Sequence, residues 1–470
     1  MSQTAESLIV MEESDGEFQS VNPWTGEVIT RYRGHTDEEV REKIRRADAA
    51  FQEWREVTFD KRSELMNRVA DLLIERRDDL ARTITLEMGK PITESRAEIE
   101  KCAWACRFYA ENAEDFLADE LIETEASESF VSYDPTGVIF AIMPWNFPFW
   151  QVFRFAAPAL MAGNVGLLKH ASGVYGCAIQ IEKLFRDAGY PDAAFQALIM
   201  GHDKTEMIIS HDAISGVMLT GSEGAGSTVG SLAGKHIKKS VLELGGSNAF
   251  IVLDDADLES AVDTAVAARM ANAGQSCISG KRFIVTDGIY DRFLSSFTEA
   301  VKKIRTGDPL EDDTQFGPLA RKELAEQLHQ QVESSIEMGA ELETGGSYKD
   351  SFYEPTILTN VRPGMAVFDE ETFGPVAAVA RVSDEDEAFD LANQSRYGLG
   401  VTVFSEDIDK ALRYADRVGD GSYFINELVK SDPRLPFGGT RRSGYGRELS
   451  VEGIREFVNA KTVYIMENRE

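Results

Sequence analysis

Apolar residues recur at helical spacing through the first quarter of the chain, from Asp37 to Asn112. Val40, Ile44 and Ala47 stand three or four positions apart, as residues do when they share one face of an α-helix. Polar residues fill most of the positions between them. This pattern predicts a helical N-terminal region.

Two short apolar runs follow, at 130–133 and 138–142. The residues between them, Asp134-Pro135-Thr136-Gly137, place Pro and Gly where a chain reversal favours them. We therefore expect a hairpin that forms a small β arm. The closing segment, Thr462 to Met466, has the pattern of one terminal strand and is expected to pair with this arm or with a neighbouring subunit.

After the arm, apolar strand-like runs alternate with helical stretches such as Val174 to Ala188. This alternation is typical of a parallel sheet covered by helices, and it continues from Leu258 to Gly421. The pattern predicts two α/β domains, the second beginning near Gly245. The strand candidates are 137–142, 165–169, 197–200, 216–220, 241–244 and 249–253 in the first region, and 283–286, 376–382 and 401–404 in the second.

The length and the charge narrow the class of protein. The 470 residues exceed what one hydrophobic core normally holds and favour roughly two or three domains. The formal net charge is −31, from 80 acidic and 49 basic side chains, so a polyanion such as nucleic acid is not an expected partner. Two interpretations of the charge stay open: a well-solvated surface, and a halophilic adaptation to a high-salt cytoplasm that screens the repulsion.

The four cysteines, Cys102, Cys106, Cys177 and Cys277, lack the spacing of a disulfide framework, which favours a reducing cytoplasm. Cys102 and Cys106 lie in a helical-looking segment and are assigned to one packed helix face rather than to a metal site. Residues 1–14 lack the positive start and apolar centre of a signal peptide. No apolar run reaches the roughly 18 residues of a membrane span, so a soluble protein without a membrane partner is expected.

Two motifs combine an acid or a thiol with small residues. Cys277 follows Ala273-Gly274-Gln275-Ser276, a flexible run that lets a substrate approach a thiolate, although a lone cysteine is more often a small buried apolar side chain. Glu243 lies in an apolar run that ends at Gly245-Gly246. An apolar setting raises a carboxyl pKa toward the range of a general base, and a paired structural acid is the alternative.

The third motif is Met143-Pro144-Trp145-Asn146-Phe147-Pro148, which follows an apolar strand where α/β sheets usually bind ligands. The amide of Asn146 is a neutral donor suited to an oxyanion, with the backbone N–H of Cys277 as a second donor. A rigid loop would explain the same prolines without any catalytic role.

Together these motifs resemble those of the aldehyde dehydrogenase superfamily, and the resemblance runs from Asn22-Pro23 to Pro436-Phe437-Gly438-Gly439. The family also carries a Glu-x-Phe-Gly-Pro segment, here Glu371 to Pro375, and the same separation of 34 positions between Glu243 and Cys277. The resemblance implies an α/β fold with a Rossmann-type dinucleotide-binding domain, a second α/β catalytic domain and a small β oligomerisation arm. Their implied bounds are 1–118 with 135–245, then 246–445, and 119–134 with 446–470.

The resemblance also implies a mechanism. The Cys277 thiolate attacks an aldehyde carbon, and Asn146 with the Cys277 N–H stabilises the oxyanion. A hydride leaves to the nicotinamide of NAD or NADP. Water deprotonated by Glu243 then hydrolyses the thioester to a carboxylic acid. Because Glu243 is present, hydrolysis is expected rather than transfer to coenzyme A.

No Gly-x-Gly-x-x-Gly fingerprint follows a strand candidate, so the cofactor site is assigned by resemblance. The loop from Thr220 to Gly226 could hold a pyrophosphate, though such a loop is otherwise an ordinary turn. Ser172 replaces the glutamate that would repel a 2′-phosphate, which permits NADP without requiring it, and His170 is expected to be neutral rather than a cation. The expected cofactor-binding residues are Met143, Pro144, Trp145, Lys169, Ser172, Gly221, Ser222, Gly226, Leu244, Glu371 and Phe373.

Within the superfamily, the segments around Lys169, Asn272 and 438–450 resemble the succinate-semialdehyde dehydrogenase group. Arg154 stands eight positions after Asn146, where that group places an arginine on the substrate carboxylate, and a structural ion pair is the competing interpretation. A second arginine of some relatives is replaced here by Ala271.

Several alternatives remain for the residues that bind the substrate and for the substrate itself. Arg434 could compensate for the arginine missing at position 271, while Trp150 and Phe153 could line a pocket for less polar aldehydes. The expected substrate is succinate semialdehyde. A broad short-chain or sugar-derived aldehyde dehydrogenase and a non-catalytic nucleotide-binding protein are the alternatives. A homodimer or homotetramer without a bound metal is expected.

Overall fold

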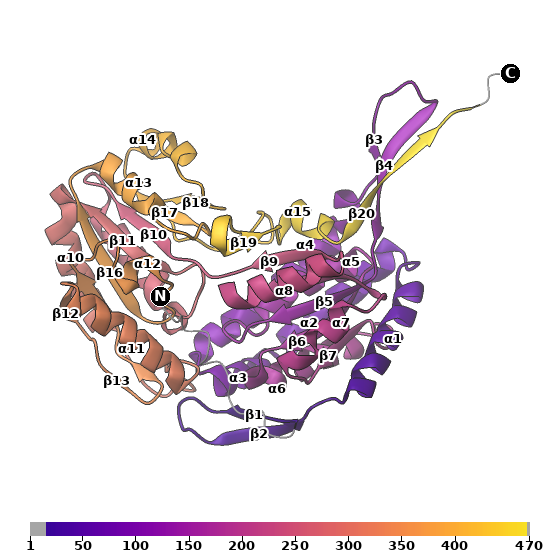
Figure 1. Ribbon diagram of the computed structural model, residues 1–470, viewed down its shortest axis with the longest axis horizontal. Helices are drawn as coiled ribbons and strands as arrows, with labels where there is room; N and C mark the ends of the chain where they lie inside the picture. The colour runs from indigo at the N-terminus through magenta and orange to yellow at the C-terminus, as the bar shows by residue number, and fades with distance from the viewer. Residues whose placement is uncertain (1–15, 468–470) are drawn as a thin grey trace.

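The computed structural model describes residues 16–467, so the expectation for residues 1–14 lies outside the described part. Figure 1 shows two α/β lobes side by side, with a thin β arm projecting from one of them. Between residues 16 and 467, no helix is both long enough and apolar enough to cross a membrane.

The predicted helical N-terminal region is confirmed. It consists of α1 (Asp37–Trp54), α2 (Phe59–Glu75), α3 (Arg77–Met88) and α4 (Ile92–Phe116). Thr36 begins α1 with a capping box, since its side chain accepts from Glu39 N while the Glu39 carboxylate accepts from Thr36 N. Ahead of these helices, β1 (Glu17–Val21) and β2 (Val28–Arg33) form an antiparallel pair.

The first lobe is built on a six-stranded sheet in the order β19-β9-β8-β5-β6-β7. Five of its strands are parallel. β6 and β7 are buried along their whole length and β5 at every residue but Ile142, as strands covered on both faces are. Its first strand, β5, has later strands on both sides, so the strand order reverses there and the crevice beyond the carboxyl ends is where such sheets bind ligands. The strands are β5 (Val138–Met143), β6 (Val165–His170), β7 (Phe195–Leu198), β8 (Ile214–Thr220), β9 (Lys239–Glu243) and β19 (Gly444–Tyr445).

The second lobe is built on a seven-stranded sheet in the order β12-β15-β16-β11-β10-β17-β18. Alternate residues of β10 face opposite cores, Phe250 and Val252 on one side and Ala249 and Ile251 on the other. The predicted alternation of strands and helices is thus confirmed in both regions. The strands are β10 (Asn248–Val252), β11 (Gly280–Thr286), β12 (Glu341–Thr344), β15 (Thr356–Thr359), β16 (Val376–Val382), β17 (Val401–Phe404) and β18 (Tyr423–Ile425).

The arm consists of β3 (Glu120–Leu121), β4 (Glu128–Pro135) and β20 (Val458–Ile465), and Figure 1 shows it projecting away from both lobes. β20 pairs antiparallel with β4 along its whole length, as expected of the terminal strand. The predicted hairpin between 130–133 and 138–142 is wrong, because β4 and β5 belong to different sheets. The all-apolar β5 is buried between β6 and β8, and the Thr136 and Gly137 N–H groups at the crossing donate to Asn164 Oδ1.

The remaining elements connect these sheets and cover their faces. The other helices are α5 (Trp150–Met161), α6 (Tyr175–Asp187), α7 (Thr205–Ile209), α8 (Glu223–Lys235), α9 (Leu258–Met270), α10 (Asp287–Lys302), α11 (Lys322–Glu337), α12 (Ala366–Asp369), α13 (Glu385–Asn393), α14 (Ile408–Arg413) and α15 (Ser450–Arg455). A two-stranded sheet pairs β13 (Tyr348–Lys349) with β14 (Phe352–Tyr353). The 3-10 helices are η1 (Ser172–Val174), η2 (His202–Lys204), η3 (Ala271–Gly274), η4 (Ala415–Arg417) and η5 (Arg441–Ser443).

Candidate active site

Cys277 follows η3 in the loop that joins α9 to β11 and lies between the two lobes. Three consecutive residues ahead of it, Asn272, Ala273 and Gly274, have left-handed backbone angles, with φ of 52°, 51° and 73°. Such a conformation costs roughly 1–3 kcal/mol at each residue other than glycine, so the surrounding contacts must hold the loop.

Arg269 helps to hold the loop before Cys277 in this conformation. Its fully buried guanidinium donates to the carbonyls of Gly274 (3.0 Å) and Thr372 (3.3 Å) and also to Gly374 O. It therefore fastens the loop before the nucleophile to the segment that contains Glu371. Burial lowers the pKa of Arg269 to about 9. No local sequence pattern marks Arg269 as functional beyond its position near the end of a helix.

Lys281 fastens the other side of the nucleophile loop. Its fully buried ammonium donates to the carbonyls of Ser276 (3.0 Å) and Cys277 (2.9 Å) and forms an ion pair with Glu371 Oε1 at 3.0 Å. The same Glu371 oxygen accepts from Gly246 N at 3.0 Å. Lys281 thus couples the position of Glu371 to that of Cys277, a role that sequence reasoning missed.

Asn146 meets the nucleophile loop directly. Its Nδ2 donates to Gln275 O at 3.0 Å, while Asn272 Nδ2 donates to Asn146 O at 2.8 Å. The second Nδ2 proton of Asn146 and the backbone N–H of Cys277 have no partner within the described chain. Both predicted oxyanion donors are therefore unpaired at the pocket that Asn146 and Cys277 line together.

Glu243 is the last residue of β9 and is buried, with both carboxylate oxygens lacking a hydrogen-bond partner among residues 16–467. Burial raises the pKa of Glu243 well above its usual value, and Glu448 raises it further. A β-carbon at Gly245, two residues on, would collide with Glu371 Oε2, so glycine is needed where Glu371 approaches the strand end. A carboxyl group of raised pKa in this setting is suited to general base catalysis.

Burial raises the pKa of the Cys277 thiol to about 11, while the nearby cations Arg154 and Lys281 act in the opposite direction. The thiol is therefore protonated near neutral pH in this structure. A neighbouring base has to accept its proton before it can act as a nucleophile, and Glu243 is close enough to affect the Cys277 pKa.

A pocket of about 770 Å³ leads from the crevice of the first lobe to Cys277 and Asn146. Ten of the eleven predicted cofactor residues line it, namely Met143, Pro144, Trp145, Lys169, Ser172, Gly221, Ser222, Leu244, Glu371 and Phe373. The exception is Gly226, which must be corrected: it packs beneath Leu244, where a β-carbon would lie 2.5 Å from a Leu244 methyl carbon. Gly226 thus allows α8 to approach Leu244 and does not face the pocket.

The pocket fits a dinucleotide in size and in chemistry. Ser222 caps α8 by accepting from Ala225 N at 3.3 Å, which leaves a helix N-terminus suited to a pyrophosphate at the lining. Trp145 and Phe373 form an aromatic pair at 5.6 Å next to Glu371. His170 is fully buried, its Nδ1 accepts from Ala171 N at 2.9 Å and its Nε2 lies 2.8 Å from Pro148 O. Burial also lowers the pKa of His170 to about 4, and both observations favour the predicted neutral imidazole.

None of the residues expected to bind the substrate lines this pocket. Arg154 is almost fully buried and its Nη2 lies 2.6 Å from Glu448 Oε2, as the competing interpretation expects, but its Nε and Nη2 have no hydrogen-bond partner among residues 16–467, so its anchoring role stays a prediction. Phe153 stacks with Phe149 and Phe185 in the core, because the inner face of α5 packs on α4 and β6, and does not line a pocket. Arg434 is already paired with Asp432.

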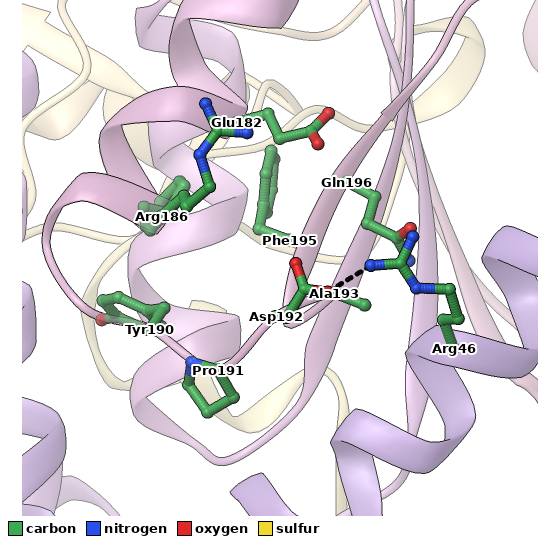
Figure 2. A pocket seen from close by; sticks show the side chains of 10 residues that line it. Arg46, Glu182, Arg186, Tyr190, Pro191, Asp192, Ala193, Phe195 and Gln196 are labelled. Atoms are coloured by element: carbon green, nitrogen blue, oxygen red, sulfur yellow. Dashed lines mark hydrogen bonds and ion pairs between the residues drawn. The ribbon is translucent and has the colours of Figure 1, made fainter.

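A second hollow lies far from the nucleophile. Figure 2 shows Arg46 paired with Asp192 among the residues that line it. Its volume of about 30 Å³ has room for little more than one water molecule. The large pocket is therefore the candidate site.

Comparisons with known proteins agree with this geometry. The sequence profile of the Aldehyde dehydrogenase family matches residues 9–463. A probable succinate-semialdehyde dehydrogenase (NADP(+)) of Synechocystis sp. is 48% identical over 449 residues, which are 95% of this chain and 99% of that protein.

Solved structures show the same relationship. The succinic semialdehyde dehydrogenase of Streptococcus pyogenes, solved with NADP+, matches with a TM-score of 0.94 at 38% identity and covers 96% of this chain and 100% of that one. The betaine aldehyde dehydrogenase of Staphylococcus aureus, solved with NAD+, matches with a TM-score of 0.92 at 32% identity, covering 97% and 92%. The profile match, these similarities and the meeting of Cys277, Asn146 and Glu371 at one pocket show that the chain belongs to the aldehyde dehydrogenase family.

Proposed function

We propose that this protein oxidises succinate semialdehyde to succinate, using NADP in preference to NAD. The observation that supports it most is the convergence of Cys277 and Asn146 at the end of a dinucleotide-sized pocket, with Glu243 at the adjoining strand end. The relative from Synechocystis sp., at 48% identity, supports the choice of substrate and cofactor.

In the first half of the reaction, Cys277 acts as the nucleophile. Its sulfur bonds to the aldehyde carbon after the thiol proton has passed to a base. Glu243 is the candidate for this base, because its pKa is raised and its charge affects the pKa of Cys277. Asn146 Nδ2 and the Cys277 N–H then donate to the oxygen that gains negative charge. NADP, when bound in the pocket, would supply the hydride acceptor that the aldehyde carbon needs to reach the oxidation level of a thioester on Cys277.

In the second half of the reaction, Glu243 acts as the general base. Its carboxylate removes a proton from a water molecule, whose oxygen adds to the thioester carbon, and the carbon–sulfur bond breaks to release the acid and the Cys277 thiolate. Burial keeps Glu243 basic enough for this step. Lys281 and Arg269 hold the loop in the same place during both halves.

Ser172 supports the preference for NADP. It lines the pocket together with Lys169, and a hydroxyl group there neither repels a 2′-phosphate nor competes with it. Lys169 would hold the ribose and its phosphate, and Glu371 the nicotinamide ribose.

We further propose that the enzyme works in the cytoplasm as a homodimer or homotetramer. The Cys277 nucleophile requires a reducing compartment. The arm formed by β3, β4 and β20 exposes Leu121, Tyr464 and Met466, apolar side chains that a neighbouring subunit would cover. The net charge of −31 supports a cytoplasm of high salt content.

The test is a comparison of two aldehydes of equal length, succinate semialdehyde and butanal, each with NADP and with NAD, followed through the absorbance of the reduced nicotinamide. A kcat/KM at least about tenfold higher for succinate semialdehyde, equal to about 1.4 kcal/mol, supports the proposed substrate. Equal values would favour a broad-specificity aldehyde dehydrogenase, and no turnover of any aldehyde would favour a nucleotide-binding protein without catalysis.

A further inference from the structure

The loops that carry Asn146 and Cys277 come from different lobes, and both are bound by side chains of the helix α4. We propose that Glu94 and Glu98, which lie one turn apart on α4, are positioning residues that set the Asn146 amide in place relative to the Cys277 thiol. This inference rests on the reaction under the proposed function and does not depend on which aldehyde is the substrate.

Glu94 holds the loop that leads to Cys277. Its Oε2 accepts from the backbone N–H of Asn272 at 2.8 Å. Asn272 is buried and begins the left-handed stretch of this loop, so its N–H needs a partner within the protein. A carboxylate is a stronger acceptor than a neutral carbonyl, and the first turn of α4 favours a negative charge. Glu94 therefore fixes the start of the strained loop from the first lobe.

Asn272 extends this contact to the predicted oxyanion donor. Its Nδ2 donates to Asn146 O at 2.8 Å and to Gln275 O at 3.1 Å. The Nδ2 of Asn146 donates to the same Gln275 oxygen at 3.0 Å. Because Gln275 lies two residues before Cys277, a shift of Asn272 would move the Asn146 amide relative to the nucleophile.

Glu98 holds the loop that carries Asn146. Its Oε1 accepts from the backbone N–H groups of Phe149 at 2.8 Å and Trp150 at 2.9 Å, directly after that loop. Its Oε2 forms a buried ion pair with Lys90. Since α4 also packs against α5 in the core of the first lobe, the helix supports both loops from one buried element.

The charges around Glu94 are consistent with a bound carboxylate. Burial raises the pKa of Glu94 to about 7, while Lys90 and the hydrogen bond from Asn272 act in the opposite direction and Glu98 adds to the rise. The ionised form accumulates as the pH rises through this value. At about pH 8, most of the protein therefore holds Asn272 through a charged acceptor.

The experiment compares the wild-type enzyme at about pH 8 with Glu94→Ala, Glu94→Gln and the matched control Glu111→Ala, which removes an exposed acid of the same helix. The rate of the first turnover is measured by stopped-flow absorbance with succinate semialdehyde and with butanal. We expect Glu94→Ala to lower this rate by about tenfold to hundredfold for both aldehydes, because the donor and the nucleophile lose their alignment. The KM for NADP should stay within about twofold of the wild-type value, since the nucleotide contacts are unchanged.

The conservative variant tests the hydrogen bond itself. The amide oxygen of Glu94→Gln can still accept from Asn272 N, so this variant should recover most of the lost rate, and Glu111→Ala should match the wild-type enzyme. A Glu94→Gln enzyme as slow as Glu94→Ala would exclude this bond as the cause. A lower melting temperature of Glu94→Ala with an unchanged first-turnover rate would show a purely structural role, and either result would overturn the inference.

A second variant tests the step from Asn272 to Asn146. Asn272→Gly keeps the backbone N–H and accepts the left-handed conformation, but it removes the side-chain bond to Asn146. It should slow the first turnover of both aldehydes, and adding Glu94→Ala should cost little more because the two residues act through one chain of contacts. An unchanged rate in Asn272→Gly would overturn the inference even if Glu94→Ala did not fold. A wild-type enzyme that turns over no aldehyde would overturn the proposed function first.

Discussion

The guanidinium of Arg154 and the carboxylate of Glu448 form a buried ion pair, with Nη2 and Oε2 2.6 Å apart and side chains 2% and 3% exposed. Arg154 also lies over the ring of Phe437 at 4.6 Å. Its charge is therefore balanced inside the protein before any substrate binds. This pairing changes what a substitution at Arg154 is expected to do.

Glu448→Gln should leave the charge of Arg154 buried without a counterion and destabilise the protein by about 3–5 kcal/mol. The double variant Arg154→Met/Glu448→Met should recover most of that loss, because both charges are then removed. Urea denaturation of the three proteins measures the effect. A double variant as unstable as Glu448→Gln would argue against an ion pair in solution.

Arg154→Met should lower kcat/KM for succinate semialdehyde and for butanal by similar factors. Its cation favours the ionised forms of Cys277 and Glu243, and those groups act on every aldehyde. Steady-state kinetics with the two substrates are the measurement. A loss confined to succinate semialdehyde would show that Arg154 holds the substrate carboxylate.

Glu243→Gln should separate the two halves of the reaction. Thioester formation should slow, because Glu243 no longer accepts the Cys277 proton, but it should still yield a burst of reduced nicotinamide close to one equivalent per active site, while steady-state turnover falls by about 10²–10⁴. Stopped-flow absorbance and the intact mass of the acylated protein are the readouts. A burst as fast as that of the wild-type enzyme would show that Cys277 loses its proton to another base.

The steady-state rate should rise with pH across the neutral and mildly alkaline range. Burial and Glu448 raise the pKa of Glu243, so the ionised base is scarce at low pH and accumulates as the pH increases. In Glu243→Gln this dependence should disappear from the hydrolysis step, whereas the burst rate should still follow the Cys277 thiol, whose pKa is raised to about 11. A flat wild-type profile for hydrolysis would contradict a buried carboxylate base.

Ser172→Glu should shift the cofactor preference from NADP toward NAD. A carboxylate at the start of η1 would repel the 2′-phosphate and accept from the hydroxyls of an unphosphorylated ribose. We expect KM for NADP to rise at least about tenfold, equal to about 1.4 kcal/mol. Ser172→Ala serves as the control, since it adds no charge, and an equal change in both variants would exclude repulsion as the cause.

Potassium chloride should stabilise the protein. Self-repulsion among the charges that sum to −31 falls as the Debye length shortens from about 30 Å at 0.01 M to about 3 Å at 1 M salt. The melting temperature should rise over this range. No change would favour the interpretation of an acidic surface that is merely well solvated.

The sequence by itself determined the features that depend on local order. Helical spacing at 37–112 and the alternation of strands and helices predicted the two α/β sheets, because these periods are set by neighbours along the chain. The motifs around Asn146, Glu243, Cys277 and Glu371 indicated the family, because a nucleophile, its base and its donors must be of particular residue types.

Only the tertiary structure decided which groups meet. It separated β4 from β5, paired Arg154 with Glu448, and placed Arg269 and Lys281 on the nucleophile loop. These outcomes depend on contacts between segments far apart in the chain, where burial determines whether a charge must find a partner, and no local pattern encodes that choice.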